Sequence, residues 1–450
     1  MVIKQWEDKN LSHFSYAVLS ECESKIVLVD PARNPEQYLE FAKQHNAEII
    51  GIIETHPHAD FVSSHKELSE LTGATVYVSK LVNAGYDHKS FDEGDEIRFG
   101  KIRMYALNTP GHSPDSISIV LEHDGKPNAV FTGDTLFIGD CGRPDLREGA
   151  GNIKATRDSL ARDMYASLRN KLMVLPDDVL VYPAHGAGTL CGKSLSKAQS
   201  STIGAEKMTN WSLQDMTGQE FVENLLSGQP FIPAYFPHDV EMNRVGAPAF
   251  RAGIEKIKID KPVSSAEEAS VLNKNLWIID ARGEKDFKEQ HLDRSINLME
   301  DGKFETWLGT IIKPGEKFYL TGGSEEQLEK LFERIAAIGY EEQVEKAFVL
   351  EYGEKRTGAL DVKEFKEDLE DYTIVDVRNP SEVETKKIFE DSIAIPLSEL
   401  RSRIGEIPVG KPIVVHCAGG YRSAAGSSLI ASKLNGNAVV YDLGEKVKEF

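Results

Sequence analysis

The segment formed by residues 55–61 constrains this chain more than any other part of its sequence. It contains His56, His58 and Asp60, and it comes directly after the apolar run 49–53. An apolar run of this length predicts a buried strand, and a loop at the end of a buried strand holds its side chains rigidly. Two imidazoles and a carboxylate held in this way are typical metal ligands. The segment therefore predicts a metal site at the end of a strand.

The last residue of this segment indicates how many metal ions the loop can bind. A hydrolase that binds two metals through such a loop would carry the pattern H-x-H-x-D-H, with a histidine at the sixth position. Here that position is Phe61, and a phenyl ring cannot ligate a metal. The sequence therefore favours one metal ion over two.

Three further segments supply ligand-type residues, each at the end of a β-like run. They contain His112, Asp134 and His185. A lone histidine is more often a surface or core residue than a ligand. Four strand ends that each offer His or Asp beside Gly or Pro are harder to explain without a shared site. We therefore expect these segments to meet around a metal.

Length, charge and cysteine content narrow the choice of function. A chain of 450 residues predicts two to four domains, at roughly 100–200 residues each. A formal charge of −20 argues against nucleic acid as a partner, because phosphate binding needs clustered Lys and Arg. No apolar run approaches the roughly 20 residues of a membrane span, and the N-terminus lacks the apolar core of a signal peptide. The four cysteines are far apart, which is typical of a reducing cytoplasm. We expect a cytoplasmic protein without a membrane partner.

The first 250 residues alternate β-like and helical stretches, which predicts an α/β fold. Segment 208–250 is rich in proline and irregular in pattern, so it is interpreted as the end of the first domain and a linker.

The remainder of the chain contains an internal repeat. Segment 276–282 matches 372–378 at an offset of 96, and 317–323 matches 412–418 at an offset of 95. Two independent matches at nearly the same spacing predict tandem copies of a domain of about 95 residues. We call 258–355 the first repeat and 358–450 the second repeat.

Cys417 follows a strand of β-branched residues and precedes a helical segment rich in small residues. Backbone N–H groups converge at a helix N-terminus and stabilise an anion, which favours the nucleophilic thiolate. Gly419 and Gly420 allow the backbone to curl around the sulfur, and Arg422 can close the cradle. The loop that follows the cysteine consists of Ala418, Gly419, Gly420, Tyr421, Arg422 and Ser423. A buried, inert cysteine fits these neighbours poorly, so Cys417 is predicted to be a catalytic nucleophile.

This chain resembles the metallo-β-lactamase superfamily in four motifs, which occur in the family's order and spacing: THPHAD, TPGHS, FTGDT and PAHGAG. The resemblance covers residues 1–250 and implies a four-layer αββα sandwich with the metal between the edges of two sheets. Two further motifs, CGRPD and AGTLCG, are similar to the persulfide dioxygenase branch. That branch implies one Fe(II) held by His56, His112 and Asp134, and a reaction that converts a persulfide, dioxygen and water into a thiol and sulfite.

The resemblance also assigns roles around the iron. Two histidines and one carboxylate leave three positions of Fe(II) open, whereas zinc has no accessible redox change. His58, Asp60 and His185 would lie outside the ligand set, where they orient ligands, contact substrate or complete a buried polar network. Arg143 is a candidate for binding an anionic part of the thiol carrier, although an arginine after glycine is as often a structural ion-pair partner.

The cysteine loop resembles that of the rhodanese family of sulfurtransferases, and Cys417 maps to the catalytic cysteine. From Cys417 to Arg422 the loop has six residues, the rhodanese length, and related phosphatases use one more. The resemblance extends to both repeats. The first repeat has Gly322 in place of the cysteine, followed by acidic residues, so we expect it to be inactive.

Together these patterns predict an α/β protein with three domains. They are an αββα metallo-β-lactamase-fold persulfide dioxygenase domain (1–250), an inactive rhodanese-like domain (258–355) and an active rhodanese domain (358–450). The expected partners are one Fe(II) per chain, a low-molecular-weight thiol persulfide, O2, and sulfite or thiosulfate, and we expect a homo-oligomer. Glutathione, coenzyme A, bacillithiol and cysteine all remain open as thiol carriers, as does the direction of sulfur transfer.

Two alternative functions remain at this stage. One is a binuclear zinc thioester hydrolase of the glyoxalase II type, which Phe61 argues against. The other is a non-catalytic persulfide carrier or sensor, which the open ligand set argues against.

Overall fold

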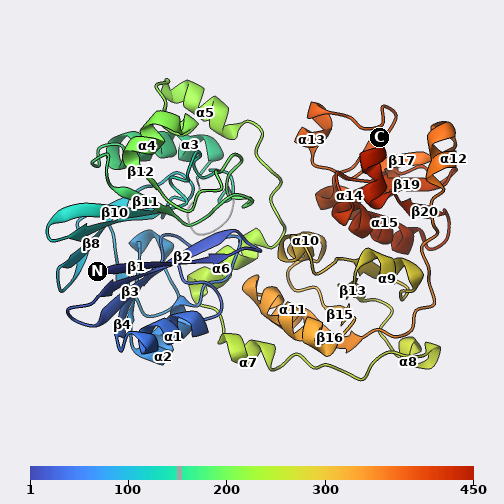
Figure 1. Cartoon of the computed structure of the whole chain (residues 1–450), viewed down its shortest axis with the longest axis horizontal. Helices are drawn as coiled ribbons and strands as arrows, with labels where there is room; N and C mark the ends of the chain where they lie inside the picture. Colours follow the sequence, from blue (N-terminus) through green and yellow to red (C-terminus); the bar gives the residue numbers. More distant parts are fainter. Residues whose placement is uncertain (149–154) are drawn as a thin grey trace. The chain divides into compact units, whose positions relative to one another are not determined.

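The computed structural model describes residues 1–148 and 155–450. These residues form two compact units, 1–252 with 336–339 and 253–335 with 340–450. Within the described ranges, the first unit contains two six-stranded sheets and the second contains two four-stranded sheets. Figure 1 labels many of the strands and helices.

The first six-stranded sheet has the strand order β1-β2-β3-β4-β5-β6. Its strands are β1 (Val2–Asp8), β2 (His13–Ser20), β3 (Lys25–Val29), β4 (Glu48–Ile53), β5 (Thr75–Val78) and β6 (Lys89–Ser90). The first three strands are antiparallel, and β3 to β6 are parallel. Helices α1 (Glu36–Gln44) and α2 (His65–Thr72) connect the parallel strands.

The second six-stranded sheet has the order β12-β11-β10-β9-β8-β7. Its strands are β7 (Glu96–Phe99), β8 (Ile102–Asn108), β9 (Ile117–His123), β10 (Lys126–Gly133), β11 (Leu180–Pro183) and β12 (Ser201–Thr202). The pair β10–β11 is parallel. Helices α3 (Arg157–Ser167), α4 (Ile203–Thr209) and α5 (Gly218–Leu226) belong to this half.

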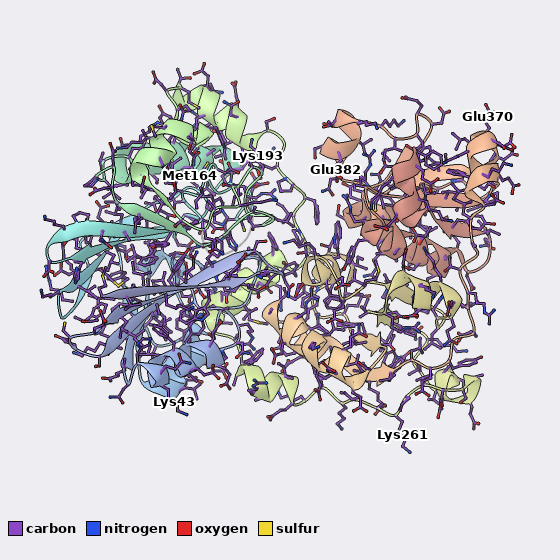
Figure 2. All side chains as sticks on the ribbon, viewed as in Figure 1. Lys43, Met164, Lys193, Lys261, Glu370 and Glu382 are labelled. Carbon is purple, nitrogen blue, oxygen red and sulfur yellow. The ribbon has the colours of Figure 1, made fainter. Side chains whose placement is uncertain are left out.

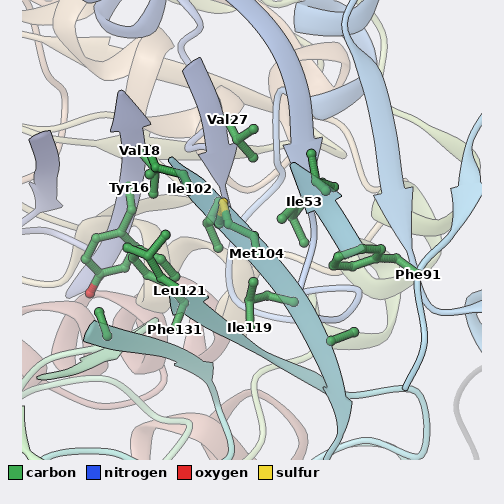
Figure 3. Close-up of a cluster of buried hydrophobic side chains, with 14 of the residues drawn as sticks. Tyr16, Val18, Val27, Ile53, Phe91, Ile102, Met104, Ile119, Leu121 and Phe131 are labelled. Atoms are coloured by element: carbon green, nitrogen blue, oxygen red, sulfur yellow. The ribbon is translucent and has the colours of Figure 1, made fainter. Parts of the chain in front are cut away.

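Side chains alternate along the strands of both sheets. On β2, Tyr16 lies in the core between the sheets, whereas Ala17 packs against α1 and α2 on the outer face. On β10, Phe131 faces the same inner core and Val130 faces the helices of the other half. Figure 3 shows the inner core, to which both sheets contribute. This period of two, with both faces buried, gives the four-layer αββα sandwich and confirms the predicted fold.

Residues 208–250, interpreted above as the end of the first domain and a linker, contain helices where an irregular segment was expected. The segment contains α5 and α6 (Phe236–Val245) and belongs to the first unit. Phe221 of α5 is buried in the core beneath the second sheet. The prolines gave a misleading signal because they lie between helices or in the first turn of α6, where a missing N–H costs nothing.

The second unit contains two parallel sheets of the same design. The order β14-β13-β15-β16 in the first repeat corresponds to β18-β17-β19-β20 in the second. The strands are β13 (Trp277–Asp280), β14 (Ser295–Asn297), β15 (Phe318–Gly322), β16 (Val344–Val349), β17 (Thr373–Asp376), β18 (Ile393–Ala394), β19 (Ile413–His416) and β20 (Val440–Asp442). Every described pairing in both sheets is parallel.

The helices of the two repeats also correspond. They are α8 (Ala266–Ser270), α9 (Glu284–Glu289), α10 (Phe304–Ile311) and α11 (Glu325–Ala337) in the first, and α12 (Val362–Glu367), α13 (Pro380–Thr385), α14 (Leu397–Arg403) and α15 (Tyr421–Leu434) in the second. Helix α7 (Phe250–Ile254) precedes the first repeat. The division at 258–355 and 358–450 remains a prediction.

The matching Asp-x-Arg sequences make the same contacts in both repeats. Arg282 pairs with Asp280 at 2.7 Å, and Arg378 pairs with Asp376 at 2.6 Å. Each arginine also donates to a backbone carbonyl eight residues further along the chain. All four side chains are buried, so the pair fixes the turn after the central strand in each repeat.

Charged side chains such as Lys43, Lys261 and Glu370 lie on the surface, whereas Met164 is buried (Figure 2). Within 1–148 and 155–450, no helix combines the length and apolar character that crossing a membrane would require.

Candidate functional site

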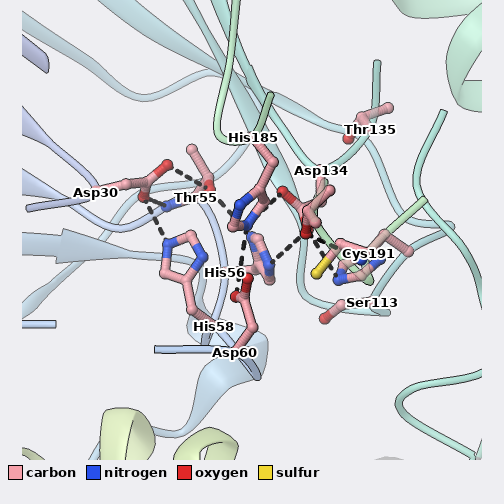
Figure 4. Close-up of polar contacts among 12 residues, drawn as sticks. Asp30, Thr55, His56, His58, Asp60, Ser113, Asp134, Thr135, His185 and Cys191 are labelled. Carbon is pink, nitrogen blue, oxygen red and sulfur yellow. Dashed lines mark hydrogen bonds and ion pairs between the residues drawn. The ribbon is translucent and has the colours of Figure 1, made fainter. Parts of the chain in front are cut away.

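The predicted ligand segments meet at the carboxyl ends of strands from both sheets of the sandwich. His56 follows β4, His112 follows β8, Asp134 follows β10 and His185 follows β11. Figure 4 shows the side chains of His56, Asp134 and His185 pointing toward one another. The sandwich therefore brings together residues that are far apart in the sequence.

His56, His112 and Asp134 form a compact, buried group. One potential ligand atom from each lies within 4.8 Å of the others. The Oδ2 atom of Asp134 is 3.4 Å from His112 Nε2 and 3.8 Å from His56 Nε2. In the described part of the chain, neither carboxylate oxygen of Asp134 accepts a hydrogen bond from a nitrogen or oxygen donor. A buried carboxylate without such donors is costly, and a metal ion would satisfy it.

Hydrogen bonds set the tautomers of both histidines. The Thr55 hydroxyl donates to Asp30 at 2.9 Å, so it accepts from Nδ1 of His56, which lies 3.0 Å away. Nδ1 of His112 donates to the carbonyl oxygen of Arg143 at 2.8 Å. A proton on Nδ1 leaves the Nε2 lone pair free, and in both rings Nε2 faces Asp134. These hydrogen bonds thus leave Nε2 of both His56 and His112 free to bind a metal.

The ionisation of these histidines also suits a metal. Burial lowers the pKa of His56 well below its ordinary value, and the nearby His58 and His112 lower it further. Burial also lowers the pKa of His112, although the Asp134 carboxylate opposes this effect. Both imidazoles are therefore neutral at pH 7, which is the form that binds metals. A donor set of two histidines and one carboxylate fits Fe(II).

His58, Asp60 and His185 form a second group beside the first. Their ligand atoms also lie within 4.8 Å of one another. His185 Nε2 is 3.5 Å from Asp60 Oδ1 and 3.5 Å from Asp134 Oδ1. Asp134 therefore presents one oxygen to each group, as a bridging carboxylate between two metals would.

Phe61 fills the space next to this second group with a hydrocarbon ring. Its ring centroid lies 4.4 Å from that of His58 and 3.7 Å from that of His13. His58 also faces Asp30, with Nε2 3.2 Å from Oδ1. Burial alone would lower the pKa of His58, but Asp30 and Glu54 raise it to about 9. The protonated ring has no free lone pair, so these contacts favour a polar network here over a second metal.

Helix α6 holds the backbone of the loop at 55–61. The Asn243 side chain donates to the carbonyl oxygens of His58 and Phe61 at 2.8 and 2.7 Å, and it accepts from the Ser63 N–H at 2.8 Å. Sequence patterns give no signal for this role, because the partners are at least 180 residues apart.

A buried ion pair lies close to the ligand group. Arg147 donates to Asp115 at 3.2 and 3.0 Å and to Ser113 at 3.0 Å. The charge of Arg147 contributes to the lowered pKa of both His56 and His112. The motif TPGHSPD contains Asp115, but its partner lies 32 residues away, which local spacing does not predict.

Arg143, the candidate for substrate binding, is already engaged within the protein. Its guanidinium donates to Asp145 at 2.6 and 2.7 Å and to the carbonyl oxygen of Leu190 at 3.1 Å. The residue is 1% exposed. The structure favours its structural role, because binding an anion would require Arg143 to leave Asp145.

The thiol of Cys191 is also close to the ligand group. Its sulfur lies within 4.8 Å of ligand atoms of Asp134 and His185. Figure 4 shows the Cys191 side chain beside Asp134. Burial raises the pKa of this thiol well above its ordinary value, so it is protonated at pH 7. The thiol can therefore donate toward Asp134 but is not a nucleophile.

The loop after β19 wraps around the sulfur of Cys417. The Gly420 N–H donates to Sγ at 3.1 Å and the Gly419 N–H at 3.5 Å. Gly420 has a φ of 105°, a conformation that favours glycine. Arg422 points to Glu382 of α13, at 2.5 and 2.9 Å. The cradle thus consists of backbone donors, and its arginine is held by a carboxylate at one side.

In the first repeat, the side chain of Gln327 occupies the corresponding loop. The side-chain oxygen of Gln327 accepts from the Gly323 N–H at 2.8 Å. A Cβ atom at Gly322 would lie 2.8 Å from that oxygen, which is too close. Gln327 occupies the position that Arg422 has in the second repeat. In the first repeat, the Gln327 carboxamide therefore accepts the N–H of Gly323 in the place where an anion would otherwise bind.

Two family models match this chain. The model described as the metallo-beta-lactamase superfamily matches residues 11–185, and the model described as the rhodanese-like domain matches residues 361–447. The chain therefore contains a metallo-β-lactamase superfamily domain followed by a C-terminal rhodanese-like domain.

The relatives of the first domain include two kinds of enzyme. The chain is 32% identical over 174 residues to a human protein named "Persulfide dioxygenase ETHE1, mitochondrial". It is also 32% identical over 176 residues to "Hydroxyacylglutathione hydrolase cytoplasmic" of Arabidopsis thaliana. Each match covers 38% of this chain and 63% of the relative. Sequence identity therefore does not separate a dioxygenase from a thioester hydrolase.

A similarity to a solved structure extends over more of the chain. The crystal structure of a metallo-beta-lactamase from Staphylococcus aureus subsp. aureus COL has a TM-score of 0.67 and 28% sequence identity. The match covers 77% of this chain and 98% of that one.

Restoring a cysteine to the first repeat should not create a second reactive thiol. In a Cys417→Ser background, Gly322→Cys is expected to be alkylated at about a tenth of the rate of native Cys417 or less, because Gln327 occupies the cradle. Site-resolved mass spectrometry after iodoacetamide treatment measures this rate. Adding Gln327→Ala should accelerate the reaction. Rapid alkylation of Gly322→Cys alone would contradict the filled-loop explanation.

Proposed function

We propose that this protein is a mononuclear iron persulfide dioxygenase coupled to sulfur transfer at Cys417. The observation that carries the proposal is the presence, in one chain, of a buried two-histidine, one-carboxylate group and a cysteine held by backbone N–H donors. Each feature alone is compatible with other chemistry. Together they suit a substrate that contains sulfane sulfur, because one site oxidises such sulfur and the other carries it.

At the first site, His56, His112 and Asp134 would hold one Fe(II). When bound, iron would supply the redox chemistry that oxidation by dioxygen requires and that zinc lacks. The protein keeps both Nε2 lone pairs directed inward, through Thr55 for His56 and the Arg143 carbonyl for His112. The overall reaction balances as R-S-SH + O2 + H2O → R-SH + SO3²⁻ + 2 H⁺.

At the second site, the Cys417 thiolate would be the sulfur carrier. A persulfide on Cys417 transfers its outer sulfur to sulfite, the Cys417 S–S bond breaks, and thiosulfate and the Cys417 thiolate are the products. In reverse, the Cys417 thiolate attacks the outer sulfur of thiosulfate, whose S–S bond breaks to release sulfite. A thiol then accepts the outer sulfur from the Cys417 persulfide, which gives R-S-SH and the free Cys417 thiolate. The N–H groups of Gly419 and Gly420 stabilise the thiolate in both directions.

The partners of the reaction are part of the same proposal. They are a low-molecular-weight thiol persulfide, dioxygen, and sulfite or thiosulfate, in a setting of sulfide detoxification or sulfur assimilation. The cytoplasmic location and the homo-oligomeric state remain predictions.

A binuclear thioester hydrolase is the second candidate. Two observations favour it: the identity to a hydroxyacylglutathione hydrolase, and the second group of His58, Asp60 and His185 beside Asp134. Phe61 opposes it, because this ring replaces a ligand of the second metal. The metal content of the protein distinguishes the two candidates.

The first experiment is metal analysis of anaerobically purified protein together with His112→Ala. The wild type should contain about one iron per chain, and the variant should lose the metal and at least about 10³-fold of persulfide-dependent oxygen uptake. His123→Ala is the matched control, because His123 is partly exposed at the end of β9. Two zinc ions per chain in the wild type would support the hydrolase, and full uptake by iron-free His112→Ala would refute the ligand assignment.

The second experiment tests the role of Phe61. Under anaerobic zinc loading, the wild type and Phe61→Leu should bind about one ion per chain, and Phe61→His should bind about two. The added imidazole would complete a second ligand set with Asp60, His185 and Asp134. Two ions in the wild type or in Phe61→Leu would show that this ring does not limit the metal count.

The third experiment separates the two activities. Cys417→Ser should lower thiosulfate formation by about 10³-fold or more, because a serine hydroxyl cannot carry sulfane sulfur. Oxygen uptake on a supplied persulfide should stay within about twofold of wild type, because the sites belong to separate compact units. Sulfite should accumulate instead of thiosulfate. Cys22→Ser is the control, since Cys22 is exposed. Unchanged thiosulfate output from Cys417→Ser would disprove the assignment of the carrier.

A further inference from the structure

An ion pair joins the first repeat to the repeat that carries Cys417. Lys288, on α9, lies 2.8 Å from Asp442 at the end of β20. The Asp442 side chain is 1% exposed, so the pair is largely removed from solvent on the acidic side. Lys288 also pairs with Glu284 on its own helix, at 2.9 Å.

Asp442 continues this contact toward the cysteine loop. Its Oδ1 atom accepts the N–H of Gly444 at 2.9 Å, which holds the turn after β20. A Cβ atom at Gly420 would lie 3.3 Å from the Glu445 nitrogen and 3.5 Å from the Gly444 carbonyl carbon. The turn therefore packs directly against Gly420, whose N–H lies 3.1 Å from the Cys417 sulfur.

The first repeat also contacts the helix that begins at the cradle. The Tyr421 hydroxyl, in the first turn of α15, donates to the carbonyl oxygen of Met299 at 3.0 Å. Further along α15, the Ser428 hydroxyl accepts the N–H of Asn297, on edge strand β14, at 2.9 Å. These bonds support the cradle from a second direction, independently of Lys288.

We propose that the first repeat is a positioning element of the sulfur-transfer site and that Lys288 is its principal positioning residue. Lys288 neutralises Asp442 and so holds the turn that supports Gly420. This inference rests on the proposed function of Cys417. It gives the repeat without a cysteine a definite role in the chemistry of its neighbour.

Lys288 supplies a positive charge that offsets the carboxylates near the Cys417 loop. On the side of the turn, Lys288 faces the carboxylates of Asp442 and Glu284, whereas the Glu445 carboxylate pairs with Lys448 at 2.8 Å. Loss of Lys288 would leave Asp442 as a buried, unpaired carboxylate, which is strongly unfavourable. An uncompensated negative charge beside the cradle also disfavours the thiolate.

The opposite side of the cradle is already balanced in charge. Arg422 pairs with Glu382, and Arg378 pairs with Asp376. Burial lowers the pKa of His416 to about 4, so this ring is neutral at pH 7. None of these described groups replaces the charge of Lys288 next to Asp442.

The pH dependence of Cys417 alkylation in the full-length protein tests this inference. Iodoacetamide modification, quantified at Cys417 by mass spectrometry, reports the thiolate directly and needs no sulfur transfer. In Lys288→Met, the midpoint of the pH profile should move up by about one pH unit, and the rate at pH 7 should fall by about tenfold. Lys288→Arg should restore the profile, since it keeps the charge.

A double variant and a control separate charge from packing. Lys288→Met combined with Asp442→Asn removes both charges and should return the midpoint toward the wild-type value. Arg401→Met is the matched control, because Arg401 also makes an ion pair between the repeats, with Glu316 at 2.6 Å. It should leave the pH profile unchanged. Where Lys288→Met fails to fold, Lys288→Gln takes its place and should show the same shift.

The outcomes are distinct. An unchanged profile in Lys288→Met, or an equal shift in Arg401→Met, would overturn the role of Lys288. A midpoint that stays shifted in the double variant would overturn the charge argument. A wild-type protein that is alkylated normally at Cys417 but transfers no sulfur would refute the proposed function and leave the positioning inference intact.

Discussion

The burial of one carboxylate between two sheets is the constraint on which the rest of the first unit depends. Asp134 is 1% exposed, and its two oxygens face two different groups of histidines. A charge in such a place is costly unless another charge or a metal satisfies it. Four strand ends converge there, and Asn243 of α6 ties down the loop that carries His56. The sandwich therefore holds the Asp134 carboxylate and the histidines around it in a buried, fixed arrangement.

In the second unit, backbone N–H groups stabilise the anionic group, whereas in the first unit a metal would do so. In both repeats an arginine and an aspartate fix the turn after the central strand, so the framework is the same. The loops differ in what satisfies their N–H donors. In the second repeat the Cys417 sulfur accepts from Gly420, and in the first the Gln327 oxygen accepts from Gly323. The first repeat has the same framework as the second without a cysteine in its loop, because the framework and the loop are stabilised by separate contacts.

The two candidate functions of the first domain differ in a few side chains within one fold. The ligand groups on either side of Asp134 are both present, and the ring of Phe61 interrupts the second. An iron dioxygenase needs one redox-active metal with open positions, whereas a two-metal hydrolase needs both groups to bind. The rhodanese-like domain in the same chain favours sulfur chemistry, since under the proposed function sulfite from the first site would accept sulfane sulfur from Cys417. In this proposal, the sulfite that the first domain produces would be a substrate of the rhodanese-like domain, which explains why the two domains occur in one chain.

The sequence by itself determined the features that depend on local order. The succession of β-like and helical stretches predicted an α/β fold, and the resemblance to the metallo-β-lactamase superfamily implied the αββα sandwich. The offsets of 96 and 95 predicted the paired sheets, and the glycines after Cys417 predicted the cradle. The resemblance to the persulfide dioxygenase branch implied His56, His112 and Asp134 as ligands, and the structure places these three side chains together. Tertiary structure alone decided the direction of Arg143 toward Asp145, the tautomer of His56 set through Asp30, the helices within 208–250 and the ion pair between Lys288 and Asp442. Periodicity and motif spacing report only neighbours along the chain, whereas these contacts depend on how strands and helices pack after the chain has folded.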